Sequence, residues 1–143
     1  LGSMKDKKQL KYDRAYINMA FEWGKLSHCK RKQVGALIVK GRMIISDGFN
    51  GAPTGFDNCC ENEKGETKWM VLHAEANAIV QSARHGVRLE DSEIYVTASP
   101  CYDCFKLIAN AGINKIYFGE FYRDEQIMEH AKELKIDLVD LSK

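Results

Sequence analysis

The chain has 143 residues, of which 45% are hydrophobic and 29% are charged, as in an ordinary globular protein of one domain. Its formal net charge of +1 gives it no global positive field with which to recruit a nucleic acid. No apolar run approaches the roughly 18–20 residues that span a bilayer, and no signal peptide is visible. We therefore expect a single cytoplasmic domain over residues 4–143, preceded by a remnant of cloning at residues 1–3.

The five cysteines are an odd number. Two of them, Cys101 and Cys104, form a Cys-x-x-Cys pair with the spacing of a metal or redox motif. The other three are Cys29, Cys59 and Cys60. This usage is typical of a protein from a reducing compartment, so no disulfide framework is expected.

The first half of the chain predicts one helix and two strands. Apolar residues at helical spacing predict a helix from Tyr12 to Lys25. Two runs rich in strand-forming residues follow at 34–39 and 43–49, with Gly41 in the short turn between them. We expect these two strands to pair as an antiparallel hairpin.

The second half alternates helices and strands. The pattern predicts helices from His73 to Gly86, from Cys101 to Gly112 and at 125–134, with strands at 93–97, 115–118 and 137–141. Such alternation implies parallel strands joined by helical crossovers. The elements together predict an α/β fold with three layers (α/β/α), in which helices cover both faces of a five-stranded mixed sheet.

A polar stretch separates the two halves. Asn50 to Gly55 is rich in Gly and Pro and predicts a loop. Asp57 to Thr67 is also polar and loop-like. Two interpretations of this second segment stay open, a plain surface connection and the rim of an active site just ahead of His73.

Two short motifs carry the candidate chemistry, His73-Ala74-Glu75 and Pro100-Cys101-x-x-Cys104. Imidazole and thiolate are ligands that zinc prefers, and three protein ligands leave the fourth tetrahedral position open, as in catalytic sites. Exposed backbone N–H groups at a helix start favour the thiolate form of cysteine. We therefore expect Zn²⁺ between two helix N-termini, where it would lower the pKa of a bound water.

Glu75 is the expected carrier of protons, because it stands beside the ligands without being needed as one. The pattern His-x-Glu with Pro-Cys-x-x-Cys is a known signature of zinc deaminases. Taken singly, the cysteines could form a redox pair and His73 could be an ordinary packed residue. A structural zinc would normally take a fourth protein ligand, so the combination with Glu75 favours a catalytic site.

Several segments resemble a known family, namely 34–36, 48–51, 73–79, 99–108 and 111–113. They are similar to the cytidine deaminase superfamily and, within it, to the deoxycytidylate (dCMP) deaminases, over most of residues 10–141. The resemblance implies the corresponding fold and a zinc-dependent hydrolase that converts dCMP to dUMP and releases ammonia in pyrimidine nucleotide metabolism. It also implies a homo-oligomer, a hexamer or a dimer, which in this family is often regulated by deoxynucleoside triphosphates.

The resemblance implies zinc ligation and proton transfer by the residues already named, and it adds four contacts to the substrate. The Ala74 backbone N–H would contact the base carbonyl, and the Ser99 carbonyl would contact the 4-amino group. Asn50 would hold the sugar or the base. Tyr122 would close over the nucleotide, although an ordinary packed aromatic is the alternative at this position.

Some similar enzymes hold a second, structural zinc with cysteines at positions like Cys29 and Cys59 or Cys60. No clear set of four ligands appears here, so a second ion is an alternative that we do not favour. A monophosphate substrate would need cationic partners, and residues 30–32 (Lys-Arg-Lys) and Arg123 could supply them. Otherwise these charges are simply solvated.

Two other classes of function compete with dCMP deamination. One is another deaminase of the superfamily, acting on a free nucleoside or base, on guanine, on tRNA adenosine or in the riboflavin pathway. The low net charge disfavours the tRNA enzyme. The other is a non-catalytic, zinc-containing nucleotide-binding module, for which Glu75 would have no use.

Overall fold

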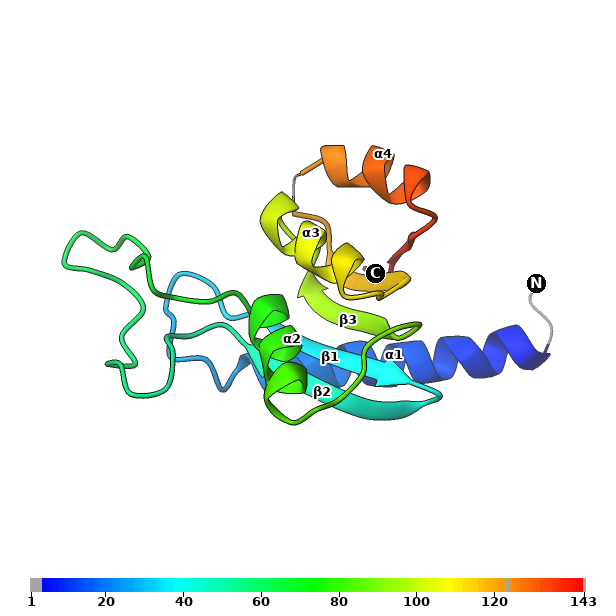
Figure 1. The fold of residues 1–143 in the computed structure, drawn as a ribbon, viewed down its shortest axis with the longest axis horizontal. Coiled ribbons are helices and arrows are strands. Elements are labelled where there is room, and N and C mark those ends of the chain that lie inside the picture. The colour runs from blue at the N-terminus through cyan, green and yellow to red at the C-terminus, as the bar shows by residue number, and fades with distance from the viewer. Residues whose placement is uncertain (1–3, 123, 143) are drawn as a thin grey trace.

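The computed structural model of the chain describes residues 4–122 and 124–142 (Figure 1). The predicted remnant of cloning at 1–3 and Arg123 therefore lie outside the described residues. The helices are α1 (Met4–Gly24), α2 (Ala74–Arg84), α3 (Tyr102–Asn110) and α4 (Gln126–Glu133). The strands are β1 (Gly35–Lys40), β2 (Met43–Phe49), β3 (Glu93–Ala98), β4 (Lys115–Glu120) and β5 (Asp137–Asp140).

The five strands form one mixed sheet in the order β2-β1-β3-β4-β5. β1 pairs antiparallel with both β2 and β3, whereas β4 pairs parallel with both β3 and β5. α3 connects β3 to β4, and α4 connects β4 to β5, as parallel neighbours require. The predicted hairpin, the mixed five-stranded sheet and the parallel crossovers are confirmed.

Helices cover both faces of the sheet, as predicted (Figure 1). On one face α1 packs Tyr16 against Tyr95 of β3, with the two ring centroids 5.0 Å apart. On the other face α2, α3 and α4 contribute Ala78, Ile108 and Ile127, which are fully buried in a single core cluster. The helices that begin at the two zinc motifs therefore share one core and one side of the sheet.

The first helix begins at Met4, earlier than the predicted start at Tyr12. Its first turns are polar and mostly exposed, and they extend beyond the sheet (Figure 1). A helix that does not bury a face shows no apolar periodicity, so the pattern detected only the packed part. None of the described helices combines the length and apolarity needed to cross a bilayer.

Two glycines of the hairpin let helices lie directly on the strands. A Cβ atom on Gly35 would come within 2.0 Å of the Ala20 carbonyl oxygen of α1. A Cβ atom on Gly48 would come within 2.6 Å of the Ala78 backbone nitrogen of α2. Glycine in a strand is typical of such a close backbone approach. Helix α2, and with it the His73 motif, is therefore seated directly against β2.

A disulfide joins Cys29 to Cys60, whose Cα atoms lie 5.0 Å apart. The expectation that the cysteines would stay unpaired is therefore wrong for these two. They meet because the loop between β2 and α2 folds back onto the residues that precede β1, which their separation of 31 positions does not reveal. Cys59 is exposed and free. Among the described residues, no second group of three metal-ligating side chains gathers around them.

Candidate active site

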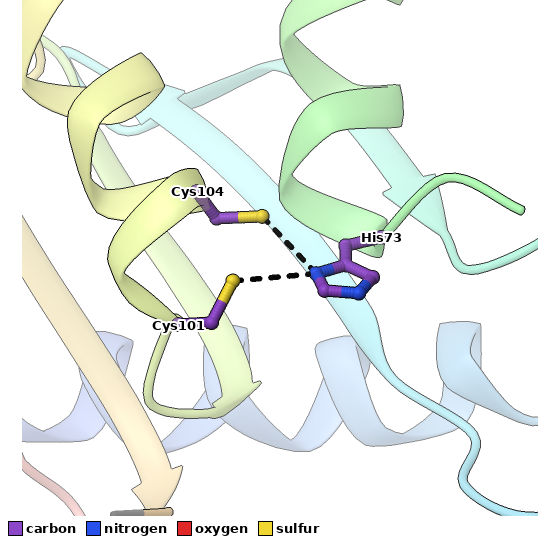
Figure 2. A group of neighbouring side chains, drawn as sticks. All are labelled: His73, Cys101 and Cys104. Carbon is purple, nitrogen blue, oxygen red and sulfur yellow. Dashed lines mark hydrogen bonds between the residues drawn. The ribbon is translucent and has the colours of Figure 1, made fainter. Parts of the chain in front are cut away.

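The two zinc motifs stand at the starts of neighbouring helices. His73 is the capping residue before α2, and Cys101 is the capping residue before α3, both with extended backbone. Figure 2 shows the His73 ring and the sulfur atoms of Cys101 and Cys104 turned toward one another from these helix ends. The structure thus brings the three side chains together between two helix N-termini, which is the arrangement expected from the sequence.

The three side chains fit a tetrahedral zinc ion. His73 Nδ1 lies 3.5 Å from Cys101 Sγ and 3.3 Å from Cys104 Sγ, and all three ligand atoms lie within 4.8 Å of one another. Zinc bonds of about 2.3 Å to sulfur and about 2.0 Å to nitrogen place S and N about 3.5 Å apart in a tetrahedron. The set supplies three ligands, so one position is left for water or substrate.

The two thiols of the site differ in their acidity. Hydrogen bonds with Cys104 and with His73 lower the pKa of Cys101 to about 4. The hydrogen bond with Cys101, together with burial, raises the pKa of Cys104 above its ordinary value. The hydrogen bond to Cys101 likewise raises the pKa of His73. Without metal at neutral pH, the pair therefore holds one thiolate and one thiol.

Glu75 lies in the first turn of α2 and is buried, with only 4% of its surface exposed. Burial disfavours its charged form and raises the pKa of its carboxyl to about 7. A carboxyl with a pKa near the working pH can both accept and donate a proton during one reaction cycle. Glu75 is therefore suited to proton transfer.

Two hydrogen bonds fix helix α2 to strand β2. The Ser46 hydroxyl donates to the Ala78 carbonyl at 2.6 Å. The Asn77 side-chain amide donates to the Phe49 carbonyl at 2.8 Å. Both bonds lie beside the close contact at Gly48, so they hold the helix that carries His73 and Glu75 in register with the sheet.

A cavity of about 270 Å³ opens beside the zinc motifs. It is lined by Cys29, Arg31, Lys32, Val34, Asn50, Glu61, Thr67, Val71, His73, Ala74, Glu75, Ala98, Ser99, Cys101 and Tyr122. Its wall therefore combines one candidate catalytic carboxyl, cationic side chains and apolar surface, which is the make-up of a site for a small polar ligand.

All four residues expected to contact a substrate line this cavity, namely Asn50, Ala74, Ser99 and Tyr122. The Tyr122 backbone N–H donates to the Ser99 hydroxyl at 2.7 Å. The Asn50 side chain is engaged with the backbone of the preceding segment, since it accepts from the Val34 N–H at 2.9 Å and donates to the Lys32 carbonyl at 2.8 Å. Asn50 therefore shapes the wall that carries Lys32.

The basic residues divide between the cavity and the surface. Arg31 and Lys32 line the cavity, whereas Lys30 is exposed and is not among the lining residues. The Lys32 ammonium lies 4.4 Å from the centre of the Tyr122 ring and 3.8 Å from a Glu120 carboxylate oxygen. Arg123, the other predicted phosphate partner, lies outside the described residues.

The loop between β2 and α2 contributes residues that the motifs did not identify. Glu61, Thr67 and Val71 line the cavity, and Glu61 and Thr67 form an isolated antiparallel bridge. The structure thus favours the second interpretation of the 57–67 segment, as part of the rim. Its polar composition was the only signal in the sequence, and it does not distinguish a rim from a plain connection.

Comparison with known proteins agrees with this site. A family profile described as the cytidine and deoxycytidylate deaminase zinc-binding region matches residues 10–120. The chain is 33% identical to the deoxycytidylate deaminase of Mycobacterium phage D29, over 75% of this chain and 93% of that protein. It is 39% identical to the ComE operon protein 2 of Bacillus subtilis (strain 168) over 68% of this chain, and it spans only 53% of that protein's length.

A solved structure gives the same result. The dCMP deaminase from the cyanophage S-TIM5, crystallised in complex with dCMP and dUMP, matches with a TM-score of 0.87 and 40% sequence identity over 92% of this chain and 97% of that one. The fold and the His-Cys-Cys group define a zinc-binding α/β domain of the deaminase type. The chain belongs to the cytidine and deoxycytidylate deaminase family.

Proposed function

We propose that the chain is a zinc-dependent hydrolase that converts dCMP to dUMP and releases ammonia, as a single domain over residues 4–143. The observation that carries this proposal is the buried Glu75 beside three convergent side chains that could bind zinc, in the wall of a cavity of about 270 Å³. The similarity to deoxycytidylate deaminases supports the choice of substrate.

His73, Cys101 and Cys104 would hold the zinc ion. Zinc with an open position lowers the pKa of a coordinated water and so supplies a nucleophile near neutral pH. As the oxygen of the attacking water bonds to C4, Glu75 would take one proton from this water and deliver it to the ring nitrogen N3 of the base. Glu75 would then take the second proton from the hydroxyl on C4 and deliver it to the 4-amino nitrogen. The bond between C4 and that nitrogen would break, so that ammonia leaves and C4 becomes a carbonyl carbon.

Backbone groups would orient the base for this reaction. The Ala74 N–H, at the start of α2, is the proposed donor to the base carbonyl, and the Ser99 carbonyl is the proposed acceptor for the 4-amino group. The two residues come from different segments of the chain, and both line the cavity. The exposed edge of the cavity would be closed by Tyr122.

Arg31 and Lys32 are the proposed partners of a phosphate group. Both line the cavity, and a guanidinium or ammonium group forms charge-assisted hydrogen bonds with phosphate oxygens. Lys32 already contacts Glu120 and the Tyr122 ring, so a phosphate would compete with the Glu120 carboxylate for its ammonium group. This cationic edge favours a monophosphate over the free nucleoside.

A substrate panel tests the proposal. Ammonia release is followed with cytosine, deoxycytidine, dCMP, dCTP, guanine and tRNA containing the reactive adenosine. We expect dCMP to give the highest kcat/KM. A higher value for any other compound would assign the chain to another deaminase class of the superfamily, and no release from any of them would indicate a non-catalytic nucleotide-binding module.

We also propose that the chain forms a homo-oligomer and acts in the cytoplasm. Large apolar side chains on the exposed faces of the helices support association, for example Val80 of α2 and Leu107 of α3, which are 55% and 48% exposed. Light scattering on the purified protein measures the mass of the particle directly. A particle with the mass of one chain at micromolar concentration would contradict the oligomer.

A further inference from the structure

Helix α3 has a candidate metal ligand at the position that usually caps a helix. The first N–H groups of a helix have no partner inside it, and Ser, Thr, Asp or Asn is the residue that usually accepts from them at this position. Here the position belongs to Cys101, whose sulfur is turned toward His73 (Figure 2). The backbone N–H of Tyr102, the first residue of α3, therefore needs an acceptor from another part of the chain.

Asp124 supplies this acceptor from the segment that follows β4. Its Oδ2 atom accepts a hydrogen bond from the Tyr102 N–H at 3.1 Å, across a separation of 22 positions in the sequence. Both residues are half-buried, so water competes less for this bond than it does at an exposed helix end. A negative charge at the N-terminus of a helix also interacts favourably with the helix dipole. Asp124 thus caps the helix that begins at Cys101 and carries Cys104.

A second contact holds the same segment against the residues that precede α3. The Tyr122 N–H donates to the Ser99 hydroxyl at 2.7 Å, and the Ser99 N–H donates to the Glu120 carbonyl at 2.9 Å. Ser99 precedes Cys101 and Tyr102 follows it in the chain. The backbone around Cys101 is therefore anchored to the segment after β4 on both sides.

We propose that Asp124 is a positioning residue for the metal. Through its hydrogen bond with the Tyr102 N–H it holds the start of α3, and with it the sulfur atoms of Cys101 and Cys104, in place for zinc. Asp124 belongs neither to the residues that line the cavity nor to the His-Cys-Cys group, so it acts through the backbone and touches neither metal nor substrate. The inference rests on the zinc ion of the function proposed above.

The first test replaces Asp124 and measures zinc affinity by competition with a chromogenic chelator. Asp124→Ala removes the acceptor, whereas Asp124→Asn keeps a side-chain oxygen that can accept the same bond. We expect Asp124→Ala to weaken zinc binding by about tenfold, as is typical of residues that orient a metal ligand, and Asp124→Asn to bind zinc nearly as well as the unmodified protein. Unchanged affinity in Asp124→Ala, or an equal loss in both variants, would overturn the role of this hydrogen bond.

Asp103→Ala is the matched control for charge. Asp103 lies in the first turn of α3, and its side chain is 88% exposed and pairs with Lys106 at 3.3 Å. This variant removes a carboxylate from the same helix start and leaves the bond between Asp124 and Tyr102 intact, so zinc affinity should change little. A loss as large as that in Asp124→Ala would mean that negative charge near the site, and not the cap, supports zinc binding, which would overturn the inference.

A second pair of variants removes the donor instead of the acceptor. Tyr102→Pro deletes the N–H, and proline is favoured at the first position of a helix. The extended backbone of Cys101 (φ −68°, ψ 159° to 169° being typical of such a position) suits a residue that precedes proline. Tyr102→Ala loses the same side chain but keeps the N–H. We expect Tyr102→Pro to bind zinc about tenfold more weakly than Tyr102→Ala, and equal affinities would overturn the inference even if Asp124→Ala failed to fold.

These measurements use no substrate, so they separate the inference from the proposed function. If the variants differ in zinc affinity as expected but the unmodified protein turns over no dCMP, the positioning role of Asp124 is supported and the proposed function fails. If the unmodified protein binds no zinc at all, both the function and the inference are overturned.

Discussion

His73 Nδ1 lies 3.3 Å from Cys104 Sγ, although the two residues are separated by 31 positions in the sequence. The contact joins the start of one helix to the first turn of another, and both helices are held on the same face of the sheet. The metal-binding group therefore depends on the packing of α2 and α3 against a common core.

Removal of one thiolate should remove the metal. We expect Cys104→Ala to weaken zinc binding by more than about a hundredfold. Changing a residue that only hydrogen-bonds to a metal ligand weakens metal binding by up to about a hundredfold, so the loss of a ligand itself should weaken it further. Zinc per chain after dialysis against a chelator is measured by mass spectrometry. Cys59→Ala is the matched control, because Cys59 is a free and exposed cysteine outside the group. An unchanged zinc content in Cys104→Ala would exclude this residue as a ligand.

Zinc binding should release protons. A thiol binds zinc only as thiolate, and the pKa of Cys104 is raised by its hydrogen bond with Cys101 and by burial, whereas the pKa of Cys101 is lowered to about 4. At pH 7 the Cys104 proton must therefore leave when zinc binds. For each proton released, the apparent affinity for zinc should weaken about tenfold when the pH is lowered by one unit.

Calorimetry in buffers of different ionisation enthalpy counts these protons. We expect at least one proton per zinc ion bound near pH 7. Release of no protons in any of the buffers, with an affinity that does not change between pH 6 and pH 8, would contradict the assigned thiol.

The carboxyl of Glu75 should be needed for turnover but not for the metal. Because it carries protons without being a ligand, Glu75→Gln should retain one zinc ion per chain and lose about 10²–10⁴-fold in kcat. Glu129→Gln, on the exposed side of α4, should behave as the unmodified protein. Full zinc content together with an undiminished kcat in Glu75→Gln would disprove the assigned proton transfer.

The guanidinium group of Arg31 should bind the phosphate group of the substrate. We expect Arg31→Ala to raise KM for dCMP by about tenfold or more, because a charge-assisted bond contributes about 1.5–3 kcal/mol, and to leave KM for deoxycytidine nearly unchanged. Lys30→Ala removes the same charge from the neighbouring, exposed position and should have little effect. A similar rise for both substrates would show that Arg31 supports the loop and not the phosphate.

Local signals in the sequence identified the zinc group, because His73 and Cys101 are each the residue that begins a helix and both helices carry clear patterns. The antiparallel hairpin and the parallel strands of the second half also followed from local rules, since hairpins pair antiparallel and crossovers pair parallel. The place of Glu61 in the cavity wall could not be predicted in this way. Its position depends on a long loop that returns to the backbone at Lys30 and Arg31.

The pairing of Cys29 with Cys60 escaped prediction for the same physical reason. It depends on where the loop between β2 and α2 travels, and turn and loop residues set no fixed path over that length. The early start of α1 at Met4 was missed because turns that bury no face leave no periodic pattern. Both features depend on the tertiary structure and leave no local signal in the sequence.

The most direct test of the central claim is a titration of metal-free protein with zinc while the conversion of dCMP to dUMP is followed. If one zinc ion at His73, Cys101 and Cys104 supports the reaction, the rate should rise in proportion to added zinc and stop rising at one ion per chain. A rate of dUMP formation in the metal-free protein equal to that of the zinc-loaded protein would contradict the claim.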